Sequence, residues 1–395
     1  MARYGSILLA VPSSIAVGDP VSLHHAQVYA PNDVIVYAEG GAVCSEESGG
    51  RYTPSSSVVK HLCAEALRSL HTSLQVHIVV PNSSLVLSED VSMERMEEYT
   101  LSLQELFKSF HARHVVVLAG SHKLPRYGSA SMLALEPEDL GVCSRSQATA
   151  EGTGSGALII ASTRYAANTH RTAAINTVRD ALQLAIRPAM QGRAAALHGD
   201  CLYALPGLDR PKDVEYLNSR YPARGSKDQG EWYFTSRKPY DVPTGDGTPV
   251  QFDRNVRTYV FGNGTENSMD AMIEAIWKDK LEHNLSAIVL KRADGSHPLA
   301  YCDPQNLESI NQVGIPIVAV GDRRVESSRV CERPGDYSNI IDGGAAGIGS
   351  NKSLYSGEAK ILLAYWLKCA ENVGYSDIED VVAYVRQKLD AYPFR

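Results

Sequence analysis

Short, mostly apolar runs alternate with longer stretches of helical spacing along this chain, and that alternation restricts its fold more than any other feature. Each apolar run ends at or near glycine, proline or serine, and the clearest are 33–37, 76–80, 114–119 and 158–162. Between them, apolar residues recur every three or four positions over 58–74, 93–110 and 177–190. Strands that alternate with helices in this way predict a mainly parallel sheet, so we expect an α/β fold.

Two further segments add to this outline. Residues 7–11 are apolar and stop at a Pro-Ser-Ser turn, which predicts an additional strand near the start of the chain. Residues 42–57 are rich in glycine and serine and are expected to form a loop.

A change of composition divides the chain. Residues 222–254 are rich in glycine, proline, aspartate and lysine and poor in aliphatic side chains, which is typical of a linker. Strand and helix patterns resume after it, beginning with a strand at 256–261 and a helix at 268–281. We therefore predict a larger N-terminal domain over 1–225, a linker over 226–254 and a smaller C-terminal domain over 255–395.

Composition excludes several classes of function. The net charge is -7 and no basic tract is present, which argues against a nucleic-acid partner. No apolar run approaches the roughly 18 residues of a membrane span, and the N-terminus lacks a secretory pattern, so we expect a cytoplasmic protein without a membrane partner.

Cofactor and metal signals are also weak. The seven cysteines are scattered without a CxxC pair, which predicts neither disulfides nor a zinc site. His111 and His114 have no carboxylate or cysteine companion at useful spacing. The glycine-rich segment 152–156 lacks a following Lys-Ser/Thr and is interpreted as a flexible connection. We expect no cofactor and no metal.

Three reactive side chains follow the predicted buried strand 114–119, namely Ser121, His122 and Lys123. Open α/β sheets bind ligands at the edge where their parallel strands end, so this position favours a binding or catalytic site. Serine can act as a nucleophile, and a histidine can act as general acid or base near neutral pH. Adjacent residues of an extended segment point to opposite sides, so a direct Ser121–His122 hydrogen bond is not expected.

The order and spacing of the segments resemble the bacterial-type asparaginase/glutaminase family over nearly the whole chain. The similarity includes a strand and helix at 157–164 and 178–185, the strand and Gly-Ser-His-Pro loop at 287–298, and the Glu-Ala-Lys-Ile-Leu-Leu sequence at 358–363. The resemblance implies an asparaginase-like two-domain fold, with a larger N-terminal flavodoxin-like parallel-sheet domain and a smaller C-terminal Rossmann-like domain. It also implies a small-molecule ligand and a homodimer or homotetramer with active sites at the subunit interface.

The family's first catalytic motif is Thr-Gly-Gly-Thr-Ile, directly after its first strand. Placed on residues 11–15, which read Val-Pro-Ser-Ser-Ile, the nucleophilic threonine falls on Val11, which has no oxygen to attack a carbonyl. Ser13 and Ser14 remain as candidates for binding substrate, although serines that cap a turn would look the same.

The second motif is an Asp-Ser pair that lies nine residues before an aromatic residue and binds the substrate carboxylate. Asp90 and Tyr99 keep that spacing, and the serine falls on Val91. Asp90 either holds the amino group of a substrate or caps the helix predicted from 93.

The remaining motifs complete the candidate site by resemblance. The family's Thr-Asp-Thr falls on Ser121, His122 and Lys123, which makes Ser121 and His122 catalytic candidates and Lys123 a substrate-binding candidate. Lys212, with Arg210 as second choice, matches the activating lysine, and a surface lysine is the alternative. Ser296 replaces the asparagine that a partner subunit contributes in the family, and it is a further substrate-binding candidate.

With its nucleophile and catalytic aspartate replaced, the site is not expected to hydrolyse asparagine by the usual threonine mechanism. Two hypotheses follow. The pocket is reused for another small-molecule reaction on an amide or related bond, which would make the protein a hydrolase of amidohydrolase ancestry. Alternatively, it is a non-catalytic homologue that binds a metabolite or acts through an oligomeric surface. Convergence of Ser121, His122 and Lys212 on an open cavity would favour the enzyme.

Overall fold

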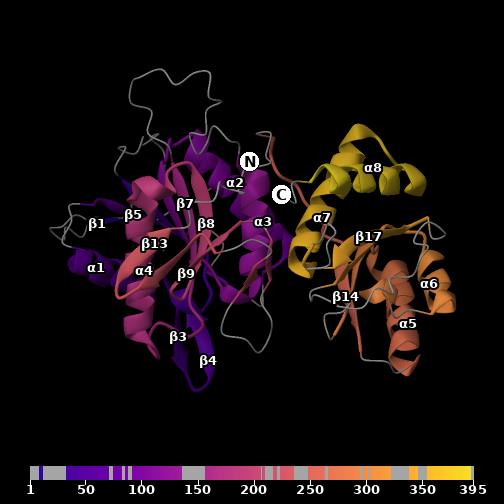
Figure 1. The fold of residues 1–395 in the computed structure, drawn as a ribbon, viewed down its shortest axis with the longest axis horizontal. Helices are drawn as coiled ribbons and strands as arrows, with labels where there is room; N and C mark the ends of the chain where they lie inside the picture. Colours follow the sequence, from indigo (N-terminus) through magenta and orange to yellow (C-terminus); the bar gives the residue numbers. More distant parts are fainter. Residues whose placement is uncertain are drawn as a thin grey trace. The chain divides into compact units, whose positions relative to one another are not determined.

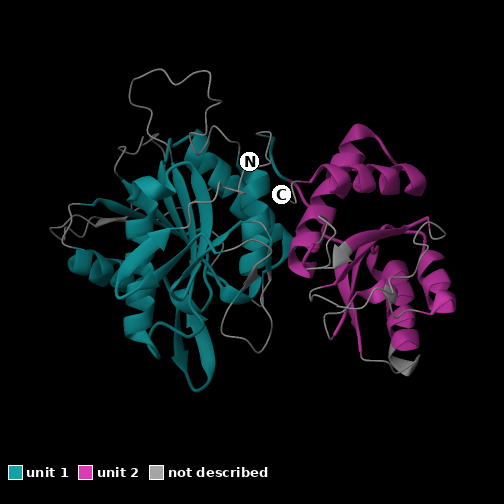
Figure 2. Ribbon diagram, in the orientation of Figure 1, with its two compact units in different colours: residues 1–250 teal, residues 251–395 magenta. Residues whose placement is uncertain are grey.

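The computed structural model of the protein describes residues 9–11, 33–70, 74–81, 85–87, 91–135, 156–205, 207–209, 217–219, 223–234, 248–262, 266–293, 297–300, 303–321, 338–345 and 354–392 (Figure 1). The chain forms two compact units, Met1–Val250 and Gln251–Arg395 (Figure 2). Each unit is built on its own sheet, and we describe them separately.

In the described part of unit 1, nine strands form one sheet in the order β1-β5-β2-β6-β7-β8-β9-β12-β13. Its centre is parallel and contains β5 (Val76–Val79), β2 (Val34–Ala38), β6 (His114–Leu118), β7 (Ala157–Ser162) and β8 (Arg193–His198). These strands are buried along almost their whole length, which explains their continuous apolar sequences. The predicted α/β class with a mainly parallel sheet is confirmed.

Helices cover both faces of this sheet. Helices α1 (Ser56–Leu70) and α4 (Arg171–Ile186) pack together against the face formed by Val34, Val36 and Ala38 of β2. Helices α2 (Met93–Lys108) and α3 (Leu124–Ala134) pack against each other and lie on the other side of the sheet (Figure 1). Because side chains alternate along a strand, residues 35, 37 and 39 face α2 and α3.

The edges of the sheet are antiparallel, and one of them extends into the predicted linker. Strand β1 (Leu9–Val11) is antiparallel to β5 and lies at the outer edge of the sheet. At the opposite edge, β9 (Cys201–Ala204), β12 (Gly225–Asp228) and β13 (Glu231–Phe234) continue the sheet with antiparallel pairing. Residues 226–234 therefore belong to the sheet of unit 1, whereas their polar composition placed them in the linker 226–254.

Two short pairs of strands complete unit 1. Residues 42–57, predicted as a loop, contain the hairpin of β3 (Ser45–Ser48) and β4 (Arg51–Pro54) and the start of α1. Strands β10 (Leu208–Asp209) and β11 (Asn218–Ser219) form a second antiparallel pair.

In the described part of unit 2, four strands form a fully parallel sheet in the order β14-β15-β16-β17. The strands are β14 (Val256–Phe261), β15 (Ala287–Arg292), β16 (Ile317–Gly321) and β17 (Ile340–Ala345). The helices are α5 (Glu266–His283), α6 (Pro304–Asn311), α7 (Ser356–Val373) and α8 (Ile378–Ala391). Alternation of parallel strands and helices gives this unit the predicted Rossmann-like character.

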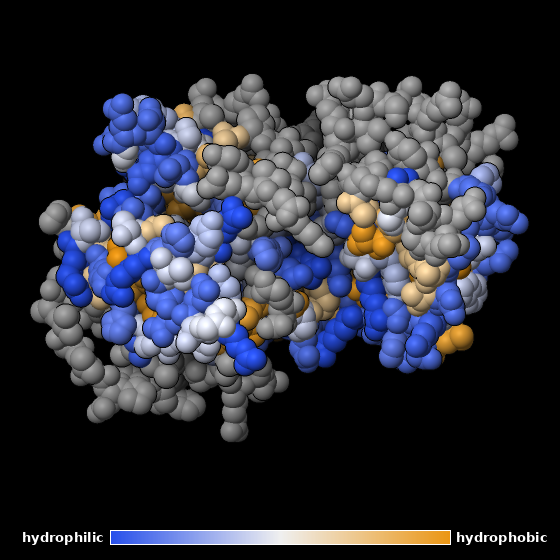
Figure 3. All heavy atoms as spheres, turned by 90° about the horizontal axis from the view of Figure 1, so that it is seen from below, coloured by the Kyte–Doolittle hydropathy of each residue, from blue (hydrophilic) through white to orange (hydrophobic). Residues whose placement is uncertain are grey.

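The face drawn in Figure 3 is mostly hydrophilic over the described residues, and its hydrophobic areas are small and separate. The helices that the structure describes include none that combines the length and apolar character of a membrane span.

Candidate functional site at the carboxyl edge of the large sheet

Of the residues proposed from sequence, three can be placed in the fold. Ser121, His122 and Lys123 form a short 3-10 helix between β6 and α3 at the carboxyl edge, where the parallel strands end. Ser121 is buried and His122 is exposed, so the turn directs these neighbouring side chains into different environments. Ser13, Ser14, Asp90, Lys212 and Ser296 lie outside the described residues.

The residue that caps the N-terminus of α2 differs from the one considered in the sequence, Asp90. The N-cap of this helix is Ser92, whose side chain accepts a hydrogen bond from the backbone N–H of Arg95 at 3.2 Å. The idea that Asp90 caps the helix is therefore wrong, because a serine two residues later already has the required geometry.

The central strand β2 is followed by a polar residue and two glycines, Glu39, Gly40 and Gly41. Both glycines have positive φ, 134° and 75°, which L side chains rarely adopt. A Cβ on Gly41 would lie 2.3 Å from the Cα of Gly120, which immediately precedes Ser121. The turns after β2 and β6 therefore touch through their backbones, and glycine is required at the contact.

Glu39 is completely buried and forms a two-point ion pair with Arg95 of α2. The Arg95 Nε donates to Glu39 Oε1 at 2.6 Å and Nη2 donates to Oε2 at 3.1 Å. The alternation along β2 that places residue 39 on the α2 side explains why this helix supplies the partner. Planar guanidinium and carboxylate groups fit each other in this geometry, which makes the pair strong and directional.

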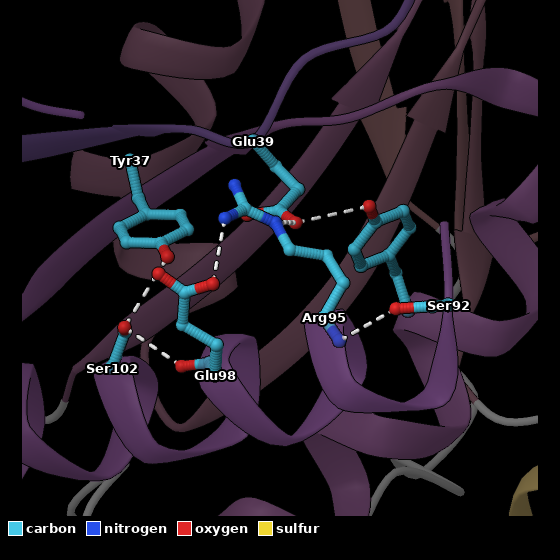
Figure 4. Close-up of polar contacts among 7 residues, drawn as sticks. Tyr37, Glu39, Ser92, Arg95, Glu98 and Ser102 are labelled. Atoms are coloured by element: carbon cyan, nitrogen blue, oxygen red, sulfur yellow. Dashed lines mark hydrogen bonds and ion pairs between the residues drawn. The ribbon is translucent and has the colours of Figure 1, made fainter. Parts of the chain in front are cut away.

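The pair belongs to a larger buried network (Figure 4). Tyr127 of α3 donates to Glu39 Oε1 at 3.2 Å, and Arg95 Nη1 donates to Glu98 Oε2 at 2.8 Å. Nearby, the Tyr37 hydroxyl donates to Ser102 at 3.2 Å. One strand and two helices thus meet through hydrogen-bonded side chains at the edge of the sheet where the sequence predicts a ligand site.

The environment of Glu39 shifts its ionisation. Burial raises its pKa to about 7, although the attraction of Arg95 and the hydrogen bonds to the carboxylate act in the opposite direction. A carboxyl group with such a pKa could exchange protons near neutrality, which is a property of many catalytic acids and bases. However, Glu39 has no exposed surface and both its oxygens are bound, as in structural ion-pair networks.

Unit 1 contains a cavity of about 350 Å³ at the carboxyl ends of β7 and β8. Its lining includes Ser162 and His198, which are hydrogen-bonded between Oγ and Nδ1 at 3.0 Å. Ser121, His122 and Lys123 do not line this cavity. Among the described residues, no three His, Cys, Asp or Glu side chains gather closely enough to hold a metal ion.

Sequence reasoning did not single out Glu39, Arg95 and Tyr127. A glutamate between an apolar run and two glycines looks like an ordinary loop residue, and its partner lies 56 positions away. A signal was nevertheless present, because residue 39 continues the alternation of 35 and 37 on one side of a buried strand.

The fold of this chain is similar to that of several solved L-asparaginase structures. The thermostable L-asparaginase of Thermococcus kodakarensis aligns with 14% identity and a TM-score of 0.62, covering 90% of this chain and 98% of that one. The chain has the asparaginase-like two-domain fold. L-asparaginase I of Vibrio cholerae O1 biovar eltor str. N16961 aligns with 13% identity and a TM-score of 0.60, covering 91% of this chain and 98% of that one.

A probable cytoplasmic L-asparaginase of Campylobacter jejuni is similar to the same extent, with 13% identity, a TM-score of 0.59, and coverage of 90% and 99%. No family model and no curated protein matches the sequence. The asparaginase-like fold is thus supported by structure at a level of identity that leaves the activity open.

Proposed function

We propose that this protein is a non-catalytic relative of the asparaginases, in which a buried ion pair replaces the reacting threonine. The proposal rests on which strand corresponds to the family's first strand. Strand β2 is the inner parallel strand that precedes β5 in the chain and lies between β5 and β6, whereas β1 is an antiparallel edge strand. On this assignment the motif Thr-Gly-Gly-Thr-Ile corresponds to residues 39–43, Glu-Gly-Gly-Ala-Val, and not to residues 11–15.

On this assignment the two glycines of the motif are retained, whereas residues 11–15 contain none. Gly40 and Gly41 occupy the glycine positions and adopt the positive φ angles that the turn requires. The two threonines are replaced by Glu39 and Ala42, so neither hydroxyl remains in this segment. The observation that carries the proposal is the burial of the Glu39 carboxylate against Arg95, which leaves no free nucleophile at this position.

The neighbouring position supports the same conclusion. Val91 stands where the second motif has its carboxylate-binding serine, and its side chain is buried at the start of α2. An apolar side chain cannot bind a charged substrate carboxylate, and burying such a carboxylate without partners is costly.

The second candidate function is reuse of the fold for another small-molecule reaction on an amide or related bond. The cavity at the ends of β7 and β8, with its hydrogen-bonded Ser162 and His198, favours this candidate. In this case the reacting groups would differ from the Ser121, His122 and Lys212 set that the sequence suggested.

We also propose that the chain assembles as a homodimer or homotetramer, as the resemblance to asparaginases implies. Light scattering coupled to size-exclusion chromatography measures the assembly directly. A monomer across the micromolar range would contradict this part of the proposal.

Ammonia release from L-asparagine and L-glutamine tests the main proposal. The purified protein and its Ser121→Ala variant are expected to release ammonia at the same background rate. Turnover by the unmodified protein that Ser121→Ala abolishes would overturn the proposal.

A further inference from the structure

The cavity at the ends of β7 and β8 has a polar floor built from two strands. Ser162 is completely buried and His198 retains 7% exposure, and the two side chains are hydrogen-bonded at 3.0 Å. Both are the last residues of their strands and are opposite each other in the parallel register. The floor is therefore held by the sheet itself, and its geometry does not depend on a loop.

The rim of the cavity carries a cationic and aromatic group of side chains. The guanidinium carbon of Arg164 lies 5.4 Å from the centre of the Tyr165 ring. The rings of Tyr165 and His170 stack with centroids 4.1 Å apart and planes 30° apart. These three residues are exposed and also line the cavity, so a ligand entering it meets them first.

The third wall is the beginning of α4, which supplies Ala173, Ala174 and Thr177. The first turn of this 16-residue helix contains no acidic residue, and the N-cap residue His170 makes no side-chain cap hydrogen bond. Helix N-termini favour negative charge because their first backbone N–H groups have no partner within the helix. Ala173 and Ala174, which line the cavity at this end of the helix, have small side chains.

Charge on the lining is unevenly divided. Among the described residues that line the cavity, Asp200 is the one carboxylate, and it is exposed in the turn between β8 and β9. Arg164, His170 and His198 are the cationic or protonatable groups. Arg171, which follows directly in the sequence, is absent from the lining because its side chain pairs with Glu65 of α1.

We infer that this cavity binds a small metabolite through an oxyanion, a phosphate or a carboxylate, placed between Arg164 and the N-terminus of α4. His198 and Ser162 supply hydrogen-bonding groups at the floor, and the Tyr165–His170 pair covers the rest of the ligand. The volume of about 350 Å³ suits a molecule larger than the bare ion, since ligand pockets span roughly 300–1,000 Å³. The inference goes beyond the proposed function and does not depend on it.

Calorimetric titration of the full chain tests the inference with three probes: inorganic phosphate, glycerol 3-phosphate and acetate. Sodium chloride at equal ionic strength corrects for general screening of charge. We expect saturable binding of at least one probe. Phosphate-type binding alone assigns a phosphorylated ligand, and acetate binding alone assigns a carboxylate.

Two variants each remove one positive charge, one at a residue that lines the cavity and one at a residue that does not. Arg164→Gln is expected to weaken binding about tenfold, the usual effect of losing a charge-assisted hydrogen bond. Arg171→Gln, which removes a charge directed away from the cavity, is the matched control and is expected to leave the affinity within about twofold. Asp200→Asn is expected to strengthen binding.

Three results would overturn the inference: no saturable binding of any probe, equal losses in the two arginine variants, or unchanged affinity in Arg164→Gln. Because Arg164 is exposed, its replacement leaves the core of the unit intact. The outcome is also separate from that of the ammonia assay. Asparagine hydrolysis would refute the non-catalytic proposal and leave the proposed oxyanion site standing. Absence of probe binding would refute the oxyanion site and leave the non-catalytic proposal standing.

Discussion

Replacing Arg95 with methionine should destabilise unit 1 strongly, because it leaves the carboxylate of Glu39 buried without its main partner. Glu39 has no exposed surface and the Arg95 side chain is 6% exposed. Methionine is long enough to fill much of the space, so the packing loss is small beside the electrostatic effect. The remaining hydrogen bond from Tyr127 is too weak to compensate for a buried charge.

The expected cost at pH 8 is about 3–5 kcal/mol, which is the range for removing one partner of a buried ion pair. At pH 5.5 the cost should be smaller. Burial already raises the pKa of Glu39 to about 7, so most of this carboxyl is protonated at pH 5.5 and needs no counterion. Native-state hydrogen exchange, read by mass spectrometry on peptides from β2 and α2, measures the free energy of opening this region at both pH values.

Arg171→Met is the control for the same chemical change at the surface. Arg171 is 58% exposed in its ion pair with Glu65, so its replacement should leave the free energy of opening nearly unchanged at either pH. A cost for Arg95→Met that is equally small, or that does not fall between pH 8 and pH 5.5, would refute the view that the Glu39–Arg95 pair is a buried structural element.

Three further predictions follow from the same region. Gly41→Ala should cost at least about 2 kcal/mol more than Gly49→Ala in the same exchange measurement. Both glycines have positive φ, but only a Cβ at position 41 would collide with Gly120. Equal costs would mean that the turns after β2 and β6 do not touch. Folding raises the pKa of Glu39 from 4.5 to about 7. The contribution of Glu39 to the free energy of unfolding should therefore be fully present below pH 4.5 and should fall by up to about 3 kcal/mol as the pH rises to about 7. A pH titration of stability should therefore lose that slope in Glu39→Gln, and an unchanged slope would assign it to other groups. Tyr127→Phe should cost about 1–2 kcal/mol at pH 8, by loss of a hydrogen bond to a buried carboxylate, and a neutral effect in denaturant unfolding would contradict that bond.

The parallel core of unit 1 could be predicted because its strands are buried on both faces. Such strands are continuous apolar runs, and the runs at 33–37, 114–119 and 158–162 were found nearly to the residue. Helix α3 was missed for a related reason. All its residues except Arg126 are buried, so it lacks the amphipathic stripe by which a surface helix is detected.

The order of the strands in the sheet could not be predicted from the local pattern of apolar residues. The interpretation of the site depended on that order. The runs at 7–11 and 33–37 are similar in composition, and only non-local pairing decides which is central. On the assignment that we propose, the first motif belongs after the run at 33–37, where Glu39 and its two glycines lie, and not after the run at 7–11. The hairpin of β12 and β13 was missed because its polar, charged strands resemble a linker.

The position of Ser121 was predicted correctly at the end of β6, but its surroundings were not. Its neighbours form a 3-10 turn where an extended segment was expected, and the polar groups around the β2 end come from α2 and α3. These contacts join residues distant in sequence, and no spacing rule within the chain identifies them.

The central claim is that Glu39 holds the structure together and does not react. Amide hydrolysis measured as ammonia release across pH 5.5 to 8.5, for the unmodified protein and for Glu39→Gln, tests it most directly. The account predicts background rates for both proteins with asparagine and glutamine at every pH. A rate that rises with pH around the raised pKa of Glu39, about 7, and that disappears in Glu39→Gln while the variant stays folded would contradict it.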